Sequence, residues 1–150
     1  MTPPLHPPAS ATRTPVVDVR GPRFGAWVTT VVLAVVLLTG SGWLLAVQAV
    51  VFAVGAFAGL RYAPYGVLFR TLVAPRLGPV RVREAEAPPR FAQLVGFGFA
   101  LVGTVGFLAG APLVGFVATG LALVAALLNA AVGFCLGCEL YLLARRARTA

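Results

Sequence analysis

The chain has 150 residues, of which 59% are hydrophobic and 11% are charged, against about 25% charged in an ordinary soluble domain. Two long stretches, residues 24–60 and 91–138, carry no charge at all. Such stretches are typical of membrane spans, and their many Leu, Val and Phe residues exclude intrinsic disorder there. The composition therefore excludes most soluble folds and predicts an integral membrane protein that has the lipid bilayer as its partner.

The net charge of +8 comes from 12 basic residues, all of them arginine, and four acidic residues. A basic balance is also found in nucleic-acid-binding proteins, but these present a basic helix or an aromatic platform, and the chain has neither. No nucleic-acid partner is predicted. In a membrane protein, an excess of arginine marks the cytoplasmic loops.

The chain opens with a proline-rich segment that has five prolines in its first 15 residues. Segments of this composition stay solvated, because they have too few apolar residues to form a core. Residues 1–20 are therefore predicted to be a disordered cytoplasmic tail.

The first uncharged stretch is too long for one span at about 1.5 Å per residue. The run Thr39-Gly40-Ser41-Gly42 interrupts it near the middle, and Gly and Ser at such a point indicate a turn. The stretch is predicted to form a helical hairpin with spans at residues 22–38 and 43–62.

A cytoplasmic loop is expected at residues 63–88, with a short helix at residues 64–74 between two prolines. At helical spacing Leu68, Phe69 and Leu72 share a face, and Arg70 points away from it. This pattern predicts an interfacial helix at the inner headgroup surface, with its arginines drawn to anionic lipid.

The second uncharged stretch breaks at Gly110-Ala111-Pro112 and predicts spans at residues 89–109 and 113–138. The fold class is thus an all-α membrane protein with four transmembrane helices arranged as two hairpins. One four-helix domain is expected at residues 21–144, followed by a cytoplasmic C-terminal tail at residues 145–150.

This topology places every arginine on one side of the membrane, before the first span, between the second and third, or after the fourth. Neither hairpin turn carries a charge. The arginine distribution predicts a multi-pass protein of the inner (plasma) membrane with both termini in the cytoplasm.

Both hairpins begin with the same tripeptide, Pro22-Arg23-Phe24 and Pro89-Arg90-Phe91. The repeat indicates a duplicated hairpin in which both copies start on the cytoplasmic side, so the repeat is parallel and not inverted.

Chemical character is concentrated in Cys135-Leu136-Gly137-Cys138, followed by Glu139. On the helix predicted for the fourth span, the two cysteines and Glu139 lie on one face near the cytoplasmic interface. Thiols at this spacing are suited to thiol exchange, to sulfur relay, or to half of a metal site completed by a second copy of the chain. We take Cys135, Cys138 and Glu139 as the candidate reactive group.

Two further readings compete with a reactive pair. A position near a helix C-terminus and beside Glu139 disfavours the thiolate, and Arg145 and Arg146, about two turns away, offset this only partly. Alternatively, the small residues Gly133 and Gly137 let another helix approach closely, and the cysteines only pack. Asn129, on the same span, is a tentative binding residue together with Arg145 and Arg146.

No metal and no cofactor are predicted, because two thiolates and one carboxylate fall short of a closed tetrahedral zinc site. A cytoplasmic location also argues against a permanent structural disulfide. The spans contain no catalytic triad and no paired carboxylates, so the chain is not predicted to be an enzyme of a recognisable class.

The sequence resembles the actinobacterial family catalogued as domain of unknown function 4395, over roughly residues 18–143. The likeness is carried by these motifs: Gly21-Pro22-Arg23-Phe24, Pro64-Tyr65-Gly66 with Phe69-Arg70, Arg76-Leu77-Gly78-Pro79, Pro89-Arg90-Phe91-Ala92-Gln93 and Gly133-Phe134-Cys135-Leu136-Gly137-Cys138-Glu139-Leu140-Tyr141. The resemblance implies an inner-membrane protein without an established activity, with genes near sulfurtransferase and thioredoxin-type genes.

These observations lead to two hypotheses. In the first, the chain is a thiol-redox or sulfur-handling accessory protein whose cysteine pair exchanges with a cytoplasmic sulfurtransferase or thioredoxin-like partner. In the second, it is a structural helix bundle that anchors another membrane protein and has no chemistry of its own. A homo-oligomer is compatible with both.

Overall fold

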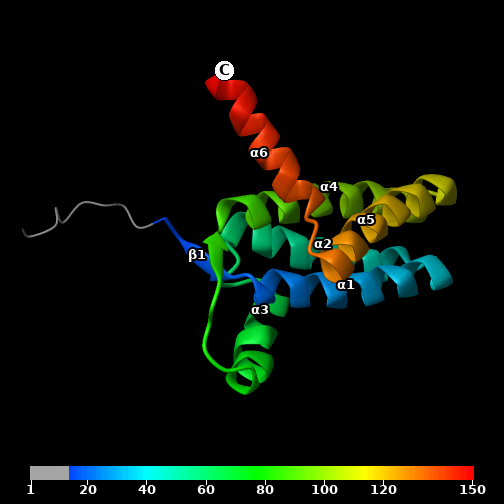
Figure 1. The fold of residues 1–150 in the computed structure, drawn as a ribbon. Helices are drawn as coiled ribbons and strands as arrows, with labels where there is room; N and C mark the ends of the chain where they lie inside the picture. Colours follow the sequence, from blue (N-terminus) through cyan, green and yellow to red (C-terminus); the bar gives the residue numbers. More distant parts are fainter. Residues whose placement is uncertain (1–13) are drawn as a thin grey trace, which may run out of the picture.

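The structure is a computed structural model that describes residues 14–150 (Figure 1). The predicted disorder of residues 1–13 lies outside the described residues. The described part of the chain is helical apart from one short ribbon. Its elements are β1 Val16–Asp18, α1 Arg20–Thr39, α2 Gly42–Ala53, the π-helical η1 Val54–Ala58, α3 Pro64–Leu68, the π-helical η2 Phe69–Val73, the 3-10 turn η3 Ala74–Arg76, β2 Arg83–Ala85, α4 Ala87–Leu108, α5 Pro112–Val132 and α6 Leu136–Thr149.

Two pairs of helices reverse direction at one end of the bundle. The first reversal follows Gly40, whose φ of 63° ends α1, and the hydroxyl of Ser41 accepts the backbone N–H of Leu44 at the start of α2. The second reversal separates α4 from α5, which begins at Pro112. The two turns lie together, since a Cβ on Gly42 would be 2.9 Å from Cβ of Phe107. Consequently α1 and α4 both start at the opposite end (Figure 1).

Within the described residues, α1, α4 and α5 are long and apolar enough to cross a membrane. A shorter apolar helix, Gly42–Ala58, combines α2 with η1. Large apolar side chains face outward along these helices; Leu113 is 75% exposed and Val31 61% exposed. Apolar side chains on the outside of apolar helices are expected where the surroundings are lipid.

Small residues and a few branched ones form the interior of the bundle. Leu33, Val36, Leu45 and Ala100 are completely buried in one cluster. The helix α4 packs against α2 on one side and α5 on the other, and α1 packs against α5. Each helix of the second hairpin, α4 and α5, therefore contacts one helix of the first hairpin.

A two-stranded antiparallel ribbon precedes both α1 and α4. In it Val16 pairs with Ala85 and Asp18 with Arg83. The predicted disorder of residues 1–20 is therefore wrong for residues 16–18, because these residues pair with β2, the strand that precedes α4. Arg20 binds the carboxylate of Asp18 at 2.8 Å and, chiefly through this hydrogen bond, lowers the pKa of Asp18.

The loop between the hairpins contains the expected helical segment, as α3 and η2. Phe69 is only 3% exposed and packs on Phe24, with ring centroids 5.7 Å apart, whereas Leu72 is 54% exposed. Phe69 therefore faces α1, and the prediction from helical spacing that it shares an outer face with Leu72 is wrong. At the other end, the hydroxyl of Tyr65 donates to the buried Oε1 of Gln48 at 2.6 Å, and burial raises the pKa of Tyr65.

The largest difference from the sequence prediction lies at the end of the last apolar stretch. The helix α5 ends at Val132 and does not continue to residue 138, because Gly133 adopts a φ of 73°. The N–H of Gly133 and that of Phe134 donate to carbonyls in the last turn of α5, in the arrangement that commonly ends a helix at glycine. A separate helix, α6, then takes up residues 136–149, including most of the predicted C-terminal tail.

Candidate functional site

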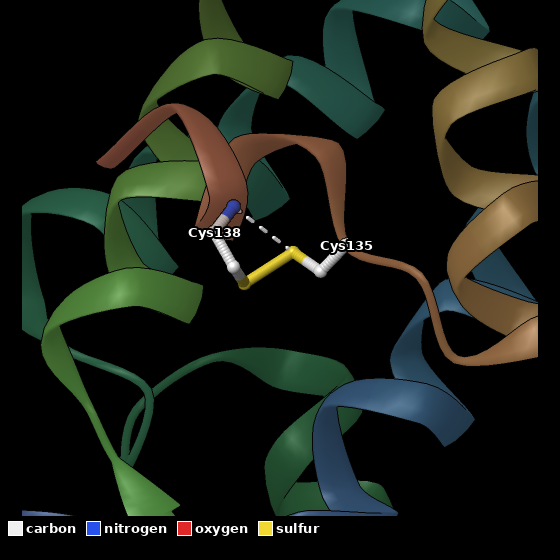
Figure 2. The surroundings of a disulfide bond; sticks show 2 residues. All are labelled: Cys135 and Cys138. Atoms are coloured by element: carbon white, nitrogen blue, oxygen red, sulfur yellow. Dashed lines mark hydrogen bonds between the residues drawn. A yellow bond between two sulfur atoms is a disulfide. The ribbon is translucent and has the colours of Figure 1, made fainter. Parts of the chain in front are cut away.

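Cys135 and Cys138 form a disulfide with Cα atoms 5.2 Å apart, and Figure 2 shows it closing the first turn of α6. Cys135 is the N-cap residue of α6 and has an extended backbone. The backbone N–H of Cys138 donates to Sγ of Cys135 at 3.3 Å. Both cysteines are partly exposed. The start of a helix thus holds the two sulfur atoms together in residues that are partly exposed.

This placement reverses the expected electrostatics of the pair. The predicted position near a helix C-terminus is wrong, because Gly133 ends α5 before the first cysteine is reached. At a helix N-terminus, the unpaired backbone N–H groups and the positive end of the dipole stabilise a thiolate. When the pair is reduced, the local backbone therefore favours ionisation of Cys135.

The first turn of α6 is held by close contact with α4. A Cβ on Gly137 would lie 2.5 Å from Cα of Ala92, so only glycine fits at this point. One turn later, the ring of Tyr141 packs on that of Phe91 with centroids 5.8 Å apart. Gly133, in contrast, has no neighbour within 4 Å of its Cβ position. The expected small-residue stripe of Gly133 and Gly137 does not exist, because the two glycines have different roles.

The side chain of Arg23, on α1, reaches the last turn of α5, just before the three residues that connect α5 to α6. Arg23 is not among the candidate site residues predicted from the sequence. Its guanidinium donates to the carbonyls of Ala130 and Ala131, both at 3.0 Å. Arg90 does the same at the end of η1, where it donates to Ala56 at 2.7 Å and Phe57 at 2.9 Å. The repeated tripeptide is the signal in the sequence that points to both.

Among the described residues, no side chain of the remaining candidate residues forms a hydrogen bond to the cysteines. Glu139 is exposed in the first turn of α6, and its backbone N–H donates to the carbonyl of Cys135 at 3.0 Å. Asn129 is partly buried in the last turn of α5, where its carbonyl accepts the N–H of Gly133. Arg145 and Arg146 are exposed toward the far end of α6. The part of the chain that the structure describes contains no metal-binding cluster of His, Cys, Asp and Glu.

The helix α3 is the counterpart of α6 in the first half of the chain. Each follows the second helix of a hairpin. Tyr141 of α6 packs on Phe91, and Phe69, the first residue of η2 directly after α3, packs on Phe24. Counted from the helix starts, Phe69 and Tyr141 are both the sixth residue. Figure 1 shows α3 and α6 leaving the bundle on opposite sides.

By the same count, Ala63 occupies the position in α3 that is equivalent to Cys135 in α6, and Gly66 the position equivalent to Cys138. Ala63 is the N-cap residue of α3, again with an extended ψ of 126°, but no side chain caps that helix. The first half of the chain therefore starts a docked helix without thiols. The architecture alone does not require cysteine at these two positions.

Comparison with known proteins gives one result. Neither the curated proteins nor the solved structures contain a match to this chain. The family model described as "Domain of unknown function (DUF4395)" matches residues 17–146, which covers both hairpins, α3 and most of α6. The chain therefore belongs to the DUF4395 family, whose function is not known.

Proposed function

We propose that the protein is a thiol-exchange protein of the inner membrane in which Cys135 and Cys138 pass electrons to or from a thiol partner in the cytoplasm. The observation that carries the proposal is the position of Cys135 as the N-cap of α6, where its Sγ accepts the N–H of Cys138. Such positions lower the pKa of a thiol and support exchange. Both bonded cysteines are partly exposed, as exchange requires.

The exchange is written as a balanced two-electron step. The thiolate of reduced Cys135 attacks a disulfide of the partner, forming a mixed disulfide and releasing one partner thiolate. The thiolate of Cys138 then attacks Sγ of Cys135, which forms the intramolecular disulfide and releases the second partner thiolate. The chain is oxidised and the partner reduced, and the reverse sequence oxidises the partner. A thioredoxin-like protein, which alternates between a disulfide and a dithiol, has the chemistry of this partner.

The comparison of the two halves favours chemistry over packing for the cysteines. The helix α3 docks with Ala63 and Gly66 at the equivalent positions, and in α6 the close contact with α4 is made by Gly137. The close helix contact that the scaffold hypothesis requires is therefore made by Gly137, and neither cysteine is needed for it.

Thiol exchange is tested on the full chain in detergent, with the rate of alkylation of the reduced protein followed against pH. We expect an apparent pKa for Cys135 below the value of about 8.5 for a free cysteine, and a disulfide reduction potential within about −270 to −120 mV, the range of exchange proteins. Cys138→Ser should trap a mixed disulfide with an oxidised thioredoxin-like protein, and Cys135→Ser should not.

Cys135→Ala/Cys138→Ala serves as the matched control, because the equivalent helix α3 starts with Ala63 and so tolerates alanine at the N-cap. It should keep the stability of the reduced protein. Thiols that react only after denaturation, or a potential below about −300 mV, which is typical of structural disulfides, would show that the pair packs or braces the chain, and the scaffold hypothesis would replace exchange.

The proposed topology has four spans with both termini in the cytoplasm. Support comes from the helices α1, α4 and α5, which are long enough to cross, and from the shorter Gly42–Ala58. Arg23 and Arg90 bind at the end of the bundle opposite the two uncharged turns, and arginines favour the cytoplasmic side.

Site-directed labelling in intact cells tests this topology in a Cys135→Ser/Cys138→Ser background. A single cysteine replacing Ser41 or Ala111, in the two turns, should react with a membrane-impermeant maleimide from outside. A cysteine replacing Val80, in the central loop, should react only after the cells are opened. Reaction of Val80→Cys from outside would overturn the orientation, and unequal behaviour of the two turn positions would overturn the four-span count.

A further inference from the structure

The helix α6 has an apolar face that the described residues do not cover. Leu136, Leu140 and Leu143 share this face at helical spacing and are 37%, 51% and 57% exposed. Gly137 and Tyr141, on a different face, make the contacts with α4. The helix is therefore anchored along one side and presents a leucine stripe on another.

The other faces of α6 carry a cluster of positive charge. Arg145, Arg146 and Arg148 are exposed on the last turns, and Arg145 lies on the face opposite the leucine stripe. A helix with a leucine face and an arginine face matches a surface that is apolar inside and anionic outside. The headgroup region of an anionic lipid leaflet is such a surface.

The depth at which α6 starts supports the same partner. Only three residues, 133–135, separate it from α5. Its second residue, Gly137, contacts Ala92, which lies five residues inside α4, about 7.5 Å from the start of that helix. Both α4 and α5 are candidate membrane spans. The first turn of α6 therefore lies level with the end of the apolar region, and Figure 1 shows the helix crossing the direction of α4 and α5.

We propose that α6 is an interfacial helix that binds anionic phospholipid: the leucine stripe inserts at the boundary between acyl chains and headgroups, and the arginines bind phosphate groups. This inference rests on the membrane placement given under Proposed function and is independent of the thiol chemistry. One consequence is that the cysteine pair is held at the membrane surface, where it is accessible to partners that approach the lipid.

Spin labelling tests the orientation of α6 in the full chain, placed in nanodiscs of phosphatidylcholine mixed with anionic phosphatidylglycerol. Leu140→Cys and Leu142→Cys, in the Cys135→Ser/Cys138→Ser background, are a matched pair of the same residue type on different faces. The label at position 140 should collide with oxygen, which dissolves in lipid, and the label at position 142 with a water-soluble nickel chelate. Equal access of nickel to both labels overturns the inference.

A label at position 140 that is shielded from oxygen and nickel alike would also overturn it, since that result indicates a protein or a second copy of the chain on the leucine stripe. Chain that leaves the nanodisc altogether would refute the membrane placement itself, whereas chain that stays with a water-exposed position 140 would refute only the role of α6. Neither result depends on whether the thiols exchange.

Hydrogen exchange of the α6 amides in the unmodified protein supplies the lipid dependence. Each arginine near an anionic surface contributes about a fivefold preference, so exchange should be about five- to a hundredfold slower with phosphatidylglycerol than in phosphatidylcholine alone. Arg145→Gln/Arg146→Gln/Arg148→Gln and high salt should both remove this difference. Protection that is the same in both lipids, with or without the arginines, contradicts binding to anionic headgroups.

Discussion

Replacing Gly137 by leucine is expected to detach α6 from α4 and to lower the free energy of unfolding by about 1–3 kcal/mol, the usual cost of overpacking. A Cβ at this position would lie 2.5 Å from Cα and 2.6 Å from Cβ of Ala92. Backbone atoms of a packed helix cannot move aside as the end of a side chain does, so α6 must move. The contact between Tyr141 and Phe91 is lost with it.

Thermal unfolding in detergent measures the loss of stability, and hydrogen exchange of residues 136–143 locates it. Gly98→Leu is the matched control, because Gly98 lies within α4 and has nothing within 4 Å of its Cβ position. That variant should be at least as stable as the parent, since a helix interior favours leucine over glycine. If the two leucine variants unfold alike, the docking of α6 on α4 is not as close as the structure has it.

The hairpin turns show how much of this fold is accessible from local sequence. Gly and Ser at residues 40–42 and Pro112 interrupt long apolar stretches. The chain reverses at these points because Gly40 adopts a positive φ and Pro112 is suited to the first position of a helix, and both properties depend on the residue itself. The strand pair of residues 16–18 and 83–85 has no such cause. It forms because α1 and α4 start at the same end of the bundle (Figure 1) and bring the two preceding segments together, a tertiary arrangement that local periodicity does not contain.

The end of α5 shows why the predicted position of the cysteine pair near a helix C-terminus is wrong. Hydropathy continues unbroken through Gly133 to Cys138, so a window over the sequence predicts one long span. The change occurs in one φ angle, at Gly133, and a glycine followed by an apolar residue is a recognisable helix stop. That helix stop predicts that a new helix begins after Gly133, with Cys135 at its start. The docking partner of α6, Ala92, is a tertiary contact and stays beyond sequence reasoning.

The second large effect is expected when both arginines of the repeated tripeptide are replaced. Arg23→Gln and Arg90→Gln should each lower the free energy of unfolding by about 1 kcal/mol, below the range of about 1.5–3 kcal/mol for hydrogen bonds of charged groups, because both side chains are largely exposed. The double variant should lose about 2 kcal/mol, since the two sites share no partner. Denaturant or thermal unfolding of the reconstituted protein measures all three.

Arg61→Gln is the control for removing positive charge at this end of the bundle. Its guanidinium lies over the ring of Tyr62 at 5.0 Å, and it donates to no helix-end carbonyl in the described part of the chain. Its loss should be small, as is usual for an exposed cation and an aromatic ring. A loss equal to that of Arg23→Gln would mean that net charge, and not the contact with α5, supports the bundle.

Lysine variants separate the two explanations of the repeated tripeptide. A helix start with an interfacial anchor needs only a positive charge, so Arg23→Lys would be silent. In the structure, these arginines have a different role. Arg23 on α1 donates to carbonyls at the end of α5, and Arg90 on α4 donates to carbonyls at the end of η1, so each hairpin caps the C-terminal end of a helix in the other. Each contact uses two parallel N–H donors, a fork that lysine lacks. Arg23→Lys and Arg90→Lys should therefore lose about half of what the glutamine variants lose, because a single ammonium replaces one of the two bonds. This crossed arrangement is a physical reason for the same three residues to begin both hairpins.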